Sequence, residues 1–130
     1  MSKKEAPSMD AWIKEAKAQP EAGECGMFLF HNGVVRQTAR AQVRGGVASA
    51  PVRGMLFSYD ADKAETARQA ALKMTGIRYA RVWLNEGELS VGDDIMFVLL
   101  GGDTRPHVVD ALQFLVGELK GKCVREKETY

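Results

Sequence analysis

Apolar residues recur at helical spacing in three segments of the chain, so that each segment would carry one apolar stripe. The stripes are Met9, Trp12, Ile13 and Ala16; Ala64, Ala67, Ala71 and Met74; and Val108, Val109, Leu112, Leu115, Val116 and Leu119. Residues that favour helix starts precede the stripes, and residues that end helices follow them. The candidate caps are Ser8, Asp60 or Asp62, and Asp103 or Thr104, and the candidate stops are Pro20, Gly76 and Gly121. The pattern predicts three packed helices.

Short apolar runs bounded by glycine or asparagine fill much of the remaining chain and have the length of β-strands. The predicted strands cover residues 25–30, 52–59, 77–85 and 95–100. Asn32-Gly33 indicates a turn or bulge near the end of the first strand, the glycines of 87–92 indicate a reversal, and Gly101-Gly102 indicates a break. The charged segment 122–130 fits either a last edge strand or an arm that a partner orders.

Helices mixed with hairpin-connected strands, without a repeated alternation of strand and helix, favour an α+β fold with a mainly antiparallel sheet. The chain has 130 residues, 45% of them hydrophobic, so we expect a single domain over 1–130 with residues 1–7 disordered. Cys25 and Cys123 lie far apart without metal-ligand spacing and are expected to stay thiols. The two histidines, His31 and His107, are also well separated, so we expect no metal site.

The charge of the chain is nearly balanced, with 18 lysines and arginines against 17 aspartates and glutamates and a net charge of +1. This balance argues against nucleic acid or an acidic membrane as a partner, so any anion site must be local. The first residues lack the apolar core of a signal peptide, and no run is long enough to cross a bilayer. We therefore expect a cytoplasmic protein.

Three cations stand at the ends of predicted elements, where an anion could be held without disturbing the core. Arg36 follows the first strand, Arg105 begins the last helix, and Lys120 stands at the end of that helix. Arginine offers a planar fork of donors to phosphate or carboxylate, and a lysine among other cations can act as a nucleophile or an acid–base group. The glycine-rich loop 40–51 fits either a ligand-ordered loop or a solvated hairpin tip.

From about Gly26 to Lys127 the chain resembles the large, catalytic subunit of molybdopterin synthase. Two motifs carry the resemblance, Gly33-Val34-Val35-Arg36 and Gly87-Glu88-Leu89-Ser90-Val91-Gly92-Asp93. The family's His-Arg at a helix start corresponds to Thr104-Arg105, its Gln-Phe to Gln113-Phe114, and its two catalytic lysines to Lys120 and Lys127. The resemblance implies an α+β fold of the α/β-hammerhead type.

The resemblance also implies an activity in molybdenum cofactor biosynthesis. In this family a small ubiquitin-like subunit inserts its carboxyl-terminal thiocarboxylate, and the sulfur passes to cyclic pyranopterin monophosphate to form molybdopterin. By this resemblance Lys120 and Lys127 are catalytic, and the substrate-binding residues are Val34, Val35, Arg36, Thr104 and Arg105. The implied assembly is a heterotetramer, in which a homodimer carries one small subunit at each end. The resemblance implies no cofactor and no metal.

Three departures from the family pattern mark a divergent member. Thr104 replaces the family's histidine, and Leu84-Asn85-Glu86 stands where the family has His-Arg. The family's aromatic residues before the second lysine are Arg125-Glu126 here, so that a one-residue gap would align Glu126 in place of Lys127. Because threonine does not exchange protons near neutral pH, one alternative is a noncatalytic homologue that keeps the dimer and the partner groove. A third possibility is an unrelated regulatory or scaffold dimer.

Overall fold

The computed structural model of the chain describes residues 2–38 and 51–130, so most of the predicted loop 40–51 lies outside the described residues. The helices and strands in chain order are α1 (Met9–Lys17), the 3-10 helix η1 (Pro20–Glu24), β1 (Met27–Val34), β2 (Gly54–Tyr59), α3 (Ala61–Leu72), β3 (Ile77–Leu84), β4 (Gly87–Ser90), β5 (Asp94–Gly102), α4 (Arg105–Glu118), the π-helix η2 (Leu119–Cys123) and β6 (Val124–Thr129).

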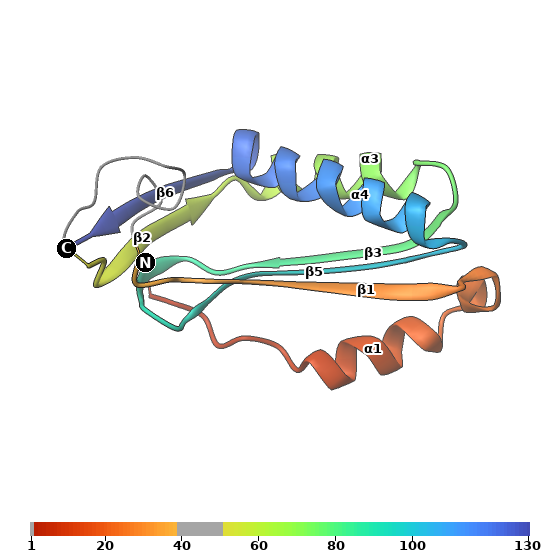
Figure 1. Ribbon diagram of the computed structural model, residues 1–130, viewed down its shortest axis with the longest axis horizontal. Helices are drawn as coiled ribbons and strands as arrows, with labels where there is room; N and C mark the ends of the chain where they lie inside the picture. Colours follow the sequence, from red (N-terminus) through yellow and green to blue (C-terminus); the bar gives the residue numbers. More distant parts are fainter. Residues whose placement is uncertain (1, 39–50) are drawn as a thin grey trace.

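Two antiparallel sheets form the frame of the described part of the chain. In the long sheet the strands lie in the order β1, β5, β3, with α3 and α4 over one face and α1 over the other (Figure 1). The shorter sheet has the order β4, β2, β6 and lies toward the end of the long sheet where β1 ends (Figure 1). This arrangement confirms the predicted α+β class with antiparallel pairing.

The core lies on both faces of β5, which has a strand on each side and a helix layer above and below. Alternate residues of a strand point to opposite faces. Val98 and Leu100 therefore pack toward α3 and α4, whereas Phe97 and Leu99 pack with Trp12 of α1. None of these four strand residues is more than 1% exposed. Such complete burial explains why the sequence of β5 is a continuous apolar run.

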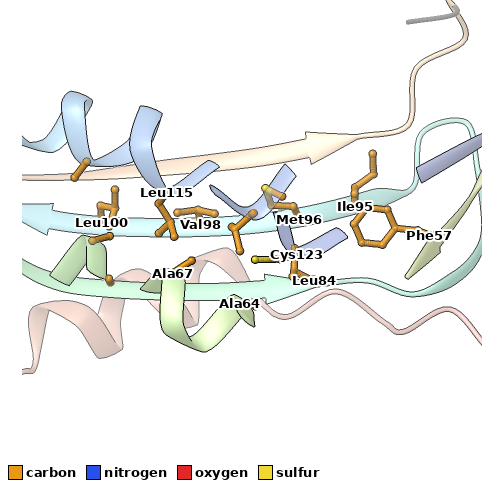
Figure 2. Packing of buried hydrophobic residues seen from close by; sticks show 14 of the residues in the cluster. Phe57, Ala64, Ala67, Leu84, Ile95, Met96, Val98, Leu100, Leu115 and Cys123 are labelled. Atoms are coloured by element: carbon orange, nitrogen blue, oxygen red, sulfur yellow. The ribbon is translucent and has the colours of Figure 1, made fainter. Parts of the chain in front are cut away.

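Helix α3 packs closely on the long sheet because its inward face consists of alanine. Ala64, Ala67 and Ala71 are buried there, and Figure 2 shows the first two on α3 beside the strands of the long sheet, in the same cluster as Leu115 of α4. The helix begins at Asp60, whose carboxylate accepts a hydrogen bond from the Lys63 backbone N–H at 3.1 Å. Asp60, the first of the two candidate caps, is thus the cap.

Helix α1 begins as the sequence predicts, but the chain after it differs. Ser8 Oγ accepts the Ala11 backbone N–H at 3.2 Å, which confirms the cap. Pro20 does follow the helix, yet it also starts η1, a short 3-10 helix that the sequence pattern did not predict. Proline suits the first position of a helix because its missing N–H would have no partner there.

The prediction that Gly101-Gly102 breaks the last strand of the long sheet is wrong. Both glycines belong to β5 and pair with β1 and β3. A Cβ on Gly101 would lie 2.5 Å from the Phe28 ring, and one on Gly102 would lie 2.7 Å from the Gly76 carbonyl oxygen. The glycines are therefore explained by close packing inside the sheet and not by chain breaking.

The segment 87–92, predicted to be a reversal, contains a short strand. Gly87–Ser90 forms β4 and pairs with β2. The Leu89 side chain of this strand belongs to the core and is 1% exposed. The reversal follows at Gly92, whose φ of 93° suits glycine, and Ser90 N–H donates to the Asp93 carboxylate there at 2.8 Å. The motif is thus a strand followed by a tight turn.

Both ends of the described chain are held by contacts. Lys4 N–H donates to Asn85 Oδ1 at 2.7 Å, and the Lys3 ammonium lies 3.0 Å from the Asp93 carboxylate, in a segment that the sequence pattern predicted to be disordered. At the other end α4 continues into η2 without stopping at Gly121, and residues Val124–Thr129 form an edge strand beside β2. Of the two readings of the tail, the edge strand is confirmed. No helix in the described residues is long and apolar enough to span a membrane.

Candidate functional site

Five of the seven candidate residues lie at two opposite ends of the long sheet. The register of β1 on β5 runs from Met27 opposite Gly102 to Val34 opposite Asp94. Arg36 follows the Val34 end, whereas Thr104 and Arg105 follow Gly102 at the other end. The nine residues of β5 separate these ends by about 26 Å at the usual rise per residue. One copy of the chain therefore does not bring Arg36 and Arg105 together.

Arg36 projects from a short segment that is fastened to the turn between β4 and β5. Val35 donates its N–H to the Asp93 carbonyl at 3.0 Å and accepts from Gly92 N–H at 2.8 Å. The Val35 side chain is 2% exposed and packs in the core, whereas Val34 is 44% exposed. The exposed Arg36 donates from Nε to the Thr38 carbonyl at 3.0 Å, and its terminal nitrogens have no partner among residues 2–38 and 51–130.

Lys120 comes to the same half of the molecule because α4 runs back over the sheet from the Gly102 end (Figure 1). It lies in η2 and is exposed, and its positive charge acts on His31 of β1. Burial first, and then the positive charge of Lys120, lower the pKa of His31 below its ordinary value. His31 Nε2 is buried and has no hydrogen-bond partner in the described part of the structure.

Lys127 lies on β6, opposite Leu56 of β2 in the register of the shorter sheet. Both side chains are exposed on the outer face, where they line a groove with Arg125. Glu126 pairs with Phe57, a core residue, so its side chain belongs to the other face of the sheet. The ungapped alignment thus puts a lysine on the outer face, and the gapped one puts a carboxylate on the inner face.

The other end of the sheet carries a hydrogen-bonded group around Asp103. Its Oδ1 accepts the Thr104 N–H at 2.6 Å and lies 2.7 Å from His107 Nδ1. The His107 contact is the main cause that lowers the pKa of Asp103 below its ordinary value. Thr104 is the N-cap of α4 but its hydroxyl makes no capping bond, so it is free to meet a ligand together with the exposed Arg105.

His31 is the residue that sequence reasoning missed. It was considered only as a metal ligand, and the described residues hold no group of three or more side chains suited to bind a metal. The signal was present in the strand pattern, because His31 is polar and has the same parity as Met27 and Leu29, which pack toward the α3 and α4 layer. What the pattern could not show is which helix residue meets it there.

A family profile described as "MoaE protein" matches residues 3–122 of the chain. A search among curated proteins finds no match. The profile covers both motifs, both ends of the long sheet and Lys120, and it stops before Lys127. The match therefore includes six of the seven candidate residues.

Solved structures share the fold. The molybdopterin biosynthesis MoaE protein from Burkholderia ambifaria MC40-6 is 18% identical over 97% of this chain and 79% of its own, with a TM-score of 0.73. For molybdopterin synthase from Staphylococcus aureus the identity is 14% over 95% and 86%, with a TM-score of 0.71. A complex of subunits 1 and 2 of molybdopterin-converting factor from Helicobacter pylori 26695 contains a chain that is 15% identical over 92% and 74%, with a TM-score of 0.65.

Proposed function

The chain belongs to the MoaE family, the large subunits of molybdopterin synthase, and on this premise we propose that it transfers sulfur from a thiocarboxylated small subunit to cyclic pyranopterin monophosphate. The product would be molybdopterin. Membership of the family supports an enzyme with a role in molybdenum cofactor biosynthesis. The sulfur transfer, the substrate and the residues that act on it are the proposal.

The observation that carries the proposal is the cationic half-site at the β1 end of the sheet. Arg36 and Lys120 both stand in this half of the molecule, and neither is paired with a carboxylate among residues 2–38 and 51–130. An arginine with free terminal nitrogens can bind a phosphate through two parallel hydrogen bonds. We assign the cyclic phosphate of the substrate to Arg36 on this ground.

Lys120 is proposed to act on the reacting atoms. Its ammonium would stabilise the negative charge that develops when the thiocarboxylate sulfur attacks the pterin, and it can donate a proton to the oxygen that leaves. Neither role requires a metal. Lys127 assists in the proposal from the outer groove of the shorter sheet, where it lies beside Leu56 and Arg125.

A second copy of the chain completes the proposed site. Arg105 and Thr104 lie at the far end of β5, so they can join Lys120 and Arg36 only from another molecule. We therefore propose a homodimer in which Arg105 of one copy reaches the Lys120 half-site of the other. Two such sites, each served by one small subunit, would give the heterotetramer.

The proposed sulfur donor is a small ubiquitin-like subunit with a carboxyl-terminal thiocarboxylate. The Helicobacter pylori relative, which shares the fold, is a complex of two subunits of molybdopterin-converting factor. On this chain the groove on the outer face of the shorter sheet combines Leu56 with the cations Arg125 and Lys127 and with the carboxylate of Glu88, which pairs with Leu56 from β4. Arg125 and Lys127 are the groups in this groove that would bind the anionic end of the tail.

The second candidate is a noncatalytic homologue that keeps the dimer and binds the small subunit without turnover. Thr104 favours it, because this position lacks the imidazole that the family carries. Reconstitution with the thiocarboxylated small subunit and pyranopterin substrate, followed as a single turnover, separates the two candidates. Product formation supports the enzyme, and tight binding of the small subunit without any product supports the noncatalytic homologue.

A further inference from the structure

His31 has a buried ring nitrogen that the described fold leaves without a hydrogen bond. Buried polar atoms in native proteins nearly always have a partner, so an unpartnered one in a candidate site points to a ligand. Resting on the sulfur-transfer function proposed above, we propose that His31 Nε2 hydrogen bonds to the anionic substrate and exchanges a proton with it. The histidine would thereby supply the proton exchange that Thr104 cannot.

The position of His31 in the sheet aims its ring toward the cationic half-site. It lies opposite Val98, whose side chain packs toward the helix layer that carries Lys120. Two residues farther along, Gly33 has the same parity, and a Cβ there would lie 3.8 Å from His31 Nε2. The nitrogen therefore points along the strand toward Gly33 and hence toward the end that leads to Arg36. A glycine at this position places no side chain against Nε2.

The charges around His31 suit a neutral imidazole that meets an anion. The opposite residue on β5 is Val98, which is uncharged, and the cation that acts on the ring from the helix layer is Lys120. Arg36 stands beyond the end of the strand. An imidazole that takes up a proton beside Lys120 is destabilised by the like charge, so it returns the proton readily unless an anion is bound.

The proton step involves one bond broken and one bond formed. A hydroxyl or N–H of the substrate loses its proton to Nε2, and the electron pair of that bond stays on the substrate. The proton then passes from Nε2 to the leaving oxygen or to water, which restores the neutral ring. No oxidant or reductant is needed.

The other histidine provides the matched control. His107 lies at the opposite end of the sheet, and its Nδ1 is engaged with Asp103 at 2.7 Å. It is therefore distant from the Lys120 half-site of its own chain. His107→Gln removes one of the two imidazoles and thereby identifies which resonance belongs to His31.

The first experiment uses NMR titration of the two imidazoles, with inorganic phosphate as the probe. In the free protein His31 should titrate below the ordinary value of a histidine, and Lys120→Met should raise its pKa. Phosphate should raise the pKa of His31 in the unsubstituted protein, and this effect should be much smaller in Lys120→Met. A His31 that titrates at the ordinary value, or that does not respond to phosphate, would overturn the proposal.

The second experiment measures single-turnover sulfur transfer by His31→Gln and by His31→Phe, with circular dichroism to confirm that each variant is folded. We expect both to lose at least about tenfold in rate and to lose the acidic limb of the pH–rate profile. A full rate with an unchanged profile in a folded variant would refute the role of His31 while the sulfur transfer stands. If the unsubstituted protein makes no product, the sulfur transfer fails, and the phosphate titration still decides whether His31 and Lys120 form an anion site.

Discussion

At the scale of single residues, the cations of the described chain divide into those that are paired and those that are not. Arg68 is held by Glu65 at 2.8 Å and also donates to the Ala80 carbonyl at 2.9 Å, which ties α3 to β3. Lys122 pairs with Glu118 at 2.9 Å. Lys120, two residues before Lys122, has no such partner among the described residues. A side chain without an internal partner is available to a ligand.

This contrast gives a matched pair of lysine variants. We expect Lys120→Ala to remove most of the single-turnover rate, about a hundredfold or more, while the affinity for the small subunit stays nearly unchanged, because a transition-state role appears in rate and not in binding. Lys122→Ala, which changes the other lysine of η2, should leave the single-turnover rate unchanged. Equal rates for the two variants would exclude Lys120 from the chemistry.

Glu65 makes the stability of α3 depend on pH. Its hydrogen bonds to Arg68 and then to Gln69 lower its pKa from 4.5 to about 2. A lowered folded pKa contributes stability that is present above pH 4.5 and is lost as the pH falls toward 2. The carboxylate is 55% exposed, so Glu65→Gln should cost only about 0.5 kcal/mol at pH 7 and nothing near pH 2.

Urea unfolding at the two pH values measures this effect. Asp110→Asn on the exposed side of α4 serves as the control, because no hydrogen bond of Asp110 to a described residue is present in the structure. If Glu65→Gln were equally destabilised at both pH values, the ion pair with Arg68 would not be the cause.

At the scale of elements, β5 is the centre of the long sheet. It pairs with β1 and β3, and it contacts α4 on one face and α1 on the other. Its last two residues are glycines that admit the Phe28 ring and the Gly76 carbonyl at distances a side chain would not allow. Gly117 in α4 is different, since a Cβ there would meet nothing within 4 Å. The same residue type is therefore required in the sheet and dispensable in the helix.

Two alanine substitutions test this difference. Gly101→Ala would put a Cβ 2.5 Å from the Phe28 ring and 3.2 Å from Cys25 Sγ, and should lower the free energy of unfolding by about 1–3 kcal/mol. Gly117→Ala should raise it by about 0.5–1 kcal/mol, because glycine disfavours a helix interior. Thermal or urea unfolding of both variants measures whether the free energy of unfolding falls for Gly101→Ala and rises for Gly117→Ala. If Gly101→Ala were as stable as the unsubstituted protein or more so, the prediction would be wrong, and β1 would have to move away from the added Cβ at no cost in free energy.

At the scale of the whole molecule, the distance between the two ends of β5 decides how a complete site can form. The Lys120 half-site and the Arg105 end cannot meet within one chain. A closed dimer that places the Arg105 end of each copy on the Lys120 half-site of the other would generate two equal sites. The proposed function therefore requires more than one copy.

Mixing two inactive variants tests the shared site. Arg105→Ala and Lys120→Ala should each abolish most sulfur transfer when expressed alone. Coexpression should restore part of the rate, because a mixed dimer holds one site with an intact Lys120 from one copy and an intact Arg105 from the other. Sedimentation of the unsubstituted protein at micromolar concentration should show a dimer. A monomer, or no recovery on coexpression, would contradict the shared site.

Three helices, the long apolar strand and the fold class follow from local sequence alone. Apolar spacing of 3.6 or 2 residues reports which face of an element is buried, and this local property predicted three helices and the long apolar strand β5. The motif ending in Arg36 and the motif ending in Asp93 determined the family in the same local way. Local spacing also misled at Gly101-Gly102, because the close approach of Phe28 comes from a distant segment.

Only the tertiary structure decided which of these residues meet. The sequence cannot show that Arg36 and Arg105 stand at opposite ends of one strand, because this follows from the antiparallel register of β1 on β5. Nor can it show that the charge of Lys120 acts on His31, since that depends on how α4 lies over the sheet (Figure 1). Site geometry arises from contacts between distant segments, and packing of the whole chain is what sets those contacts.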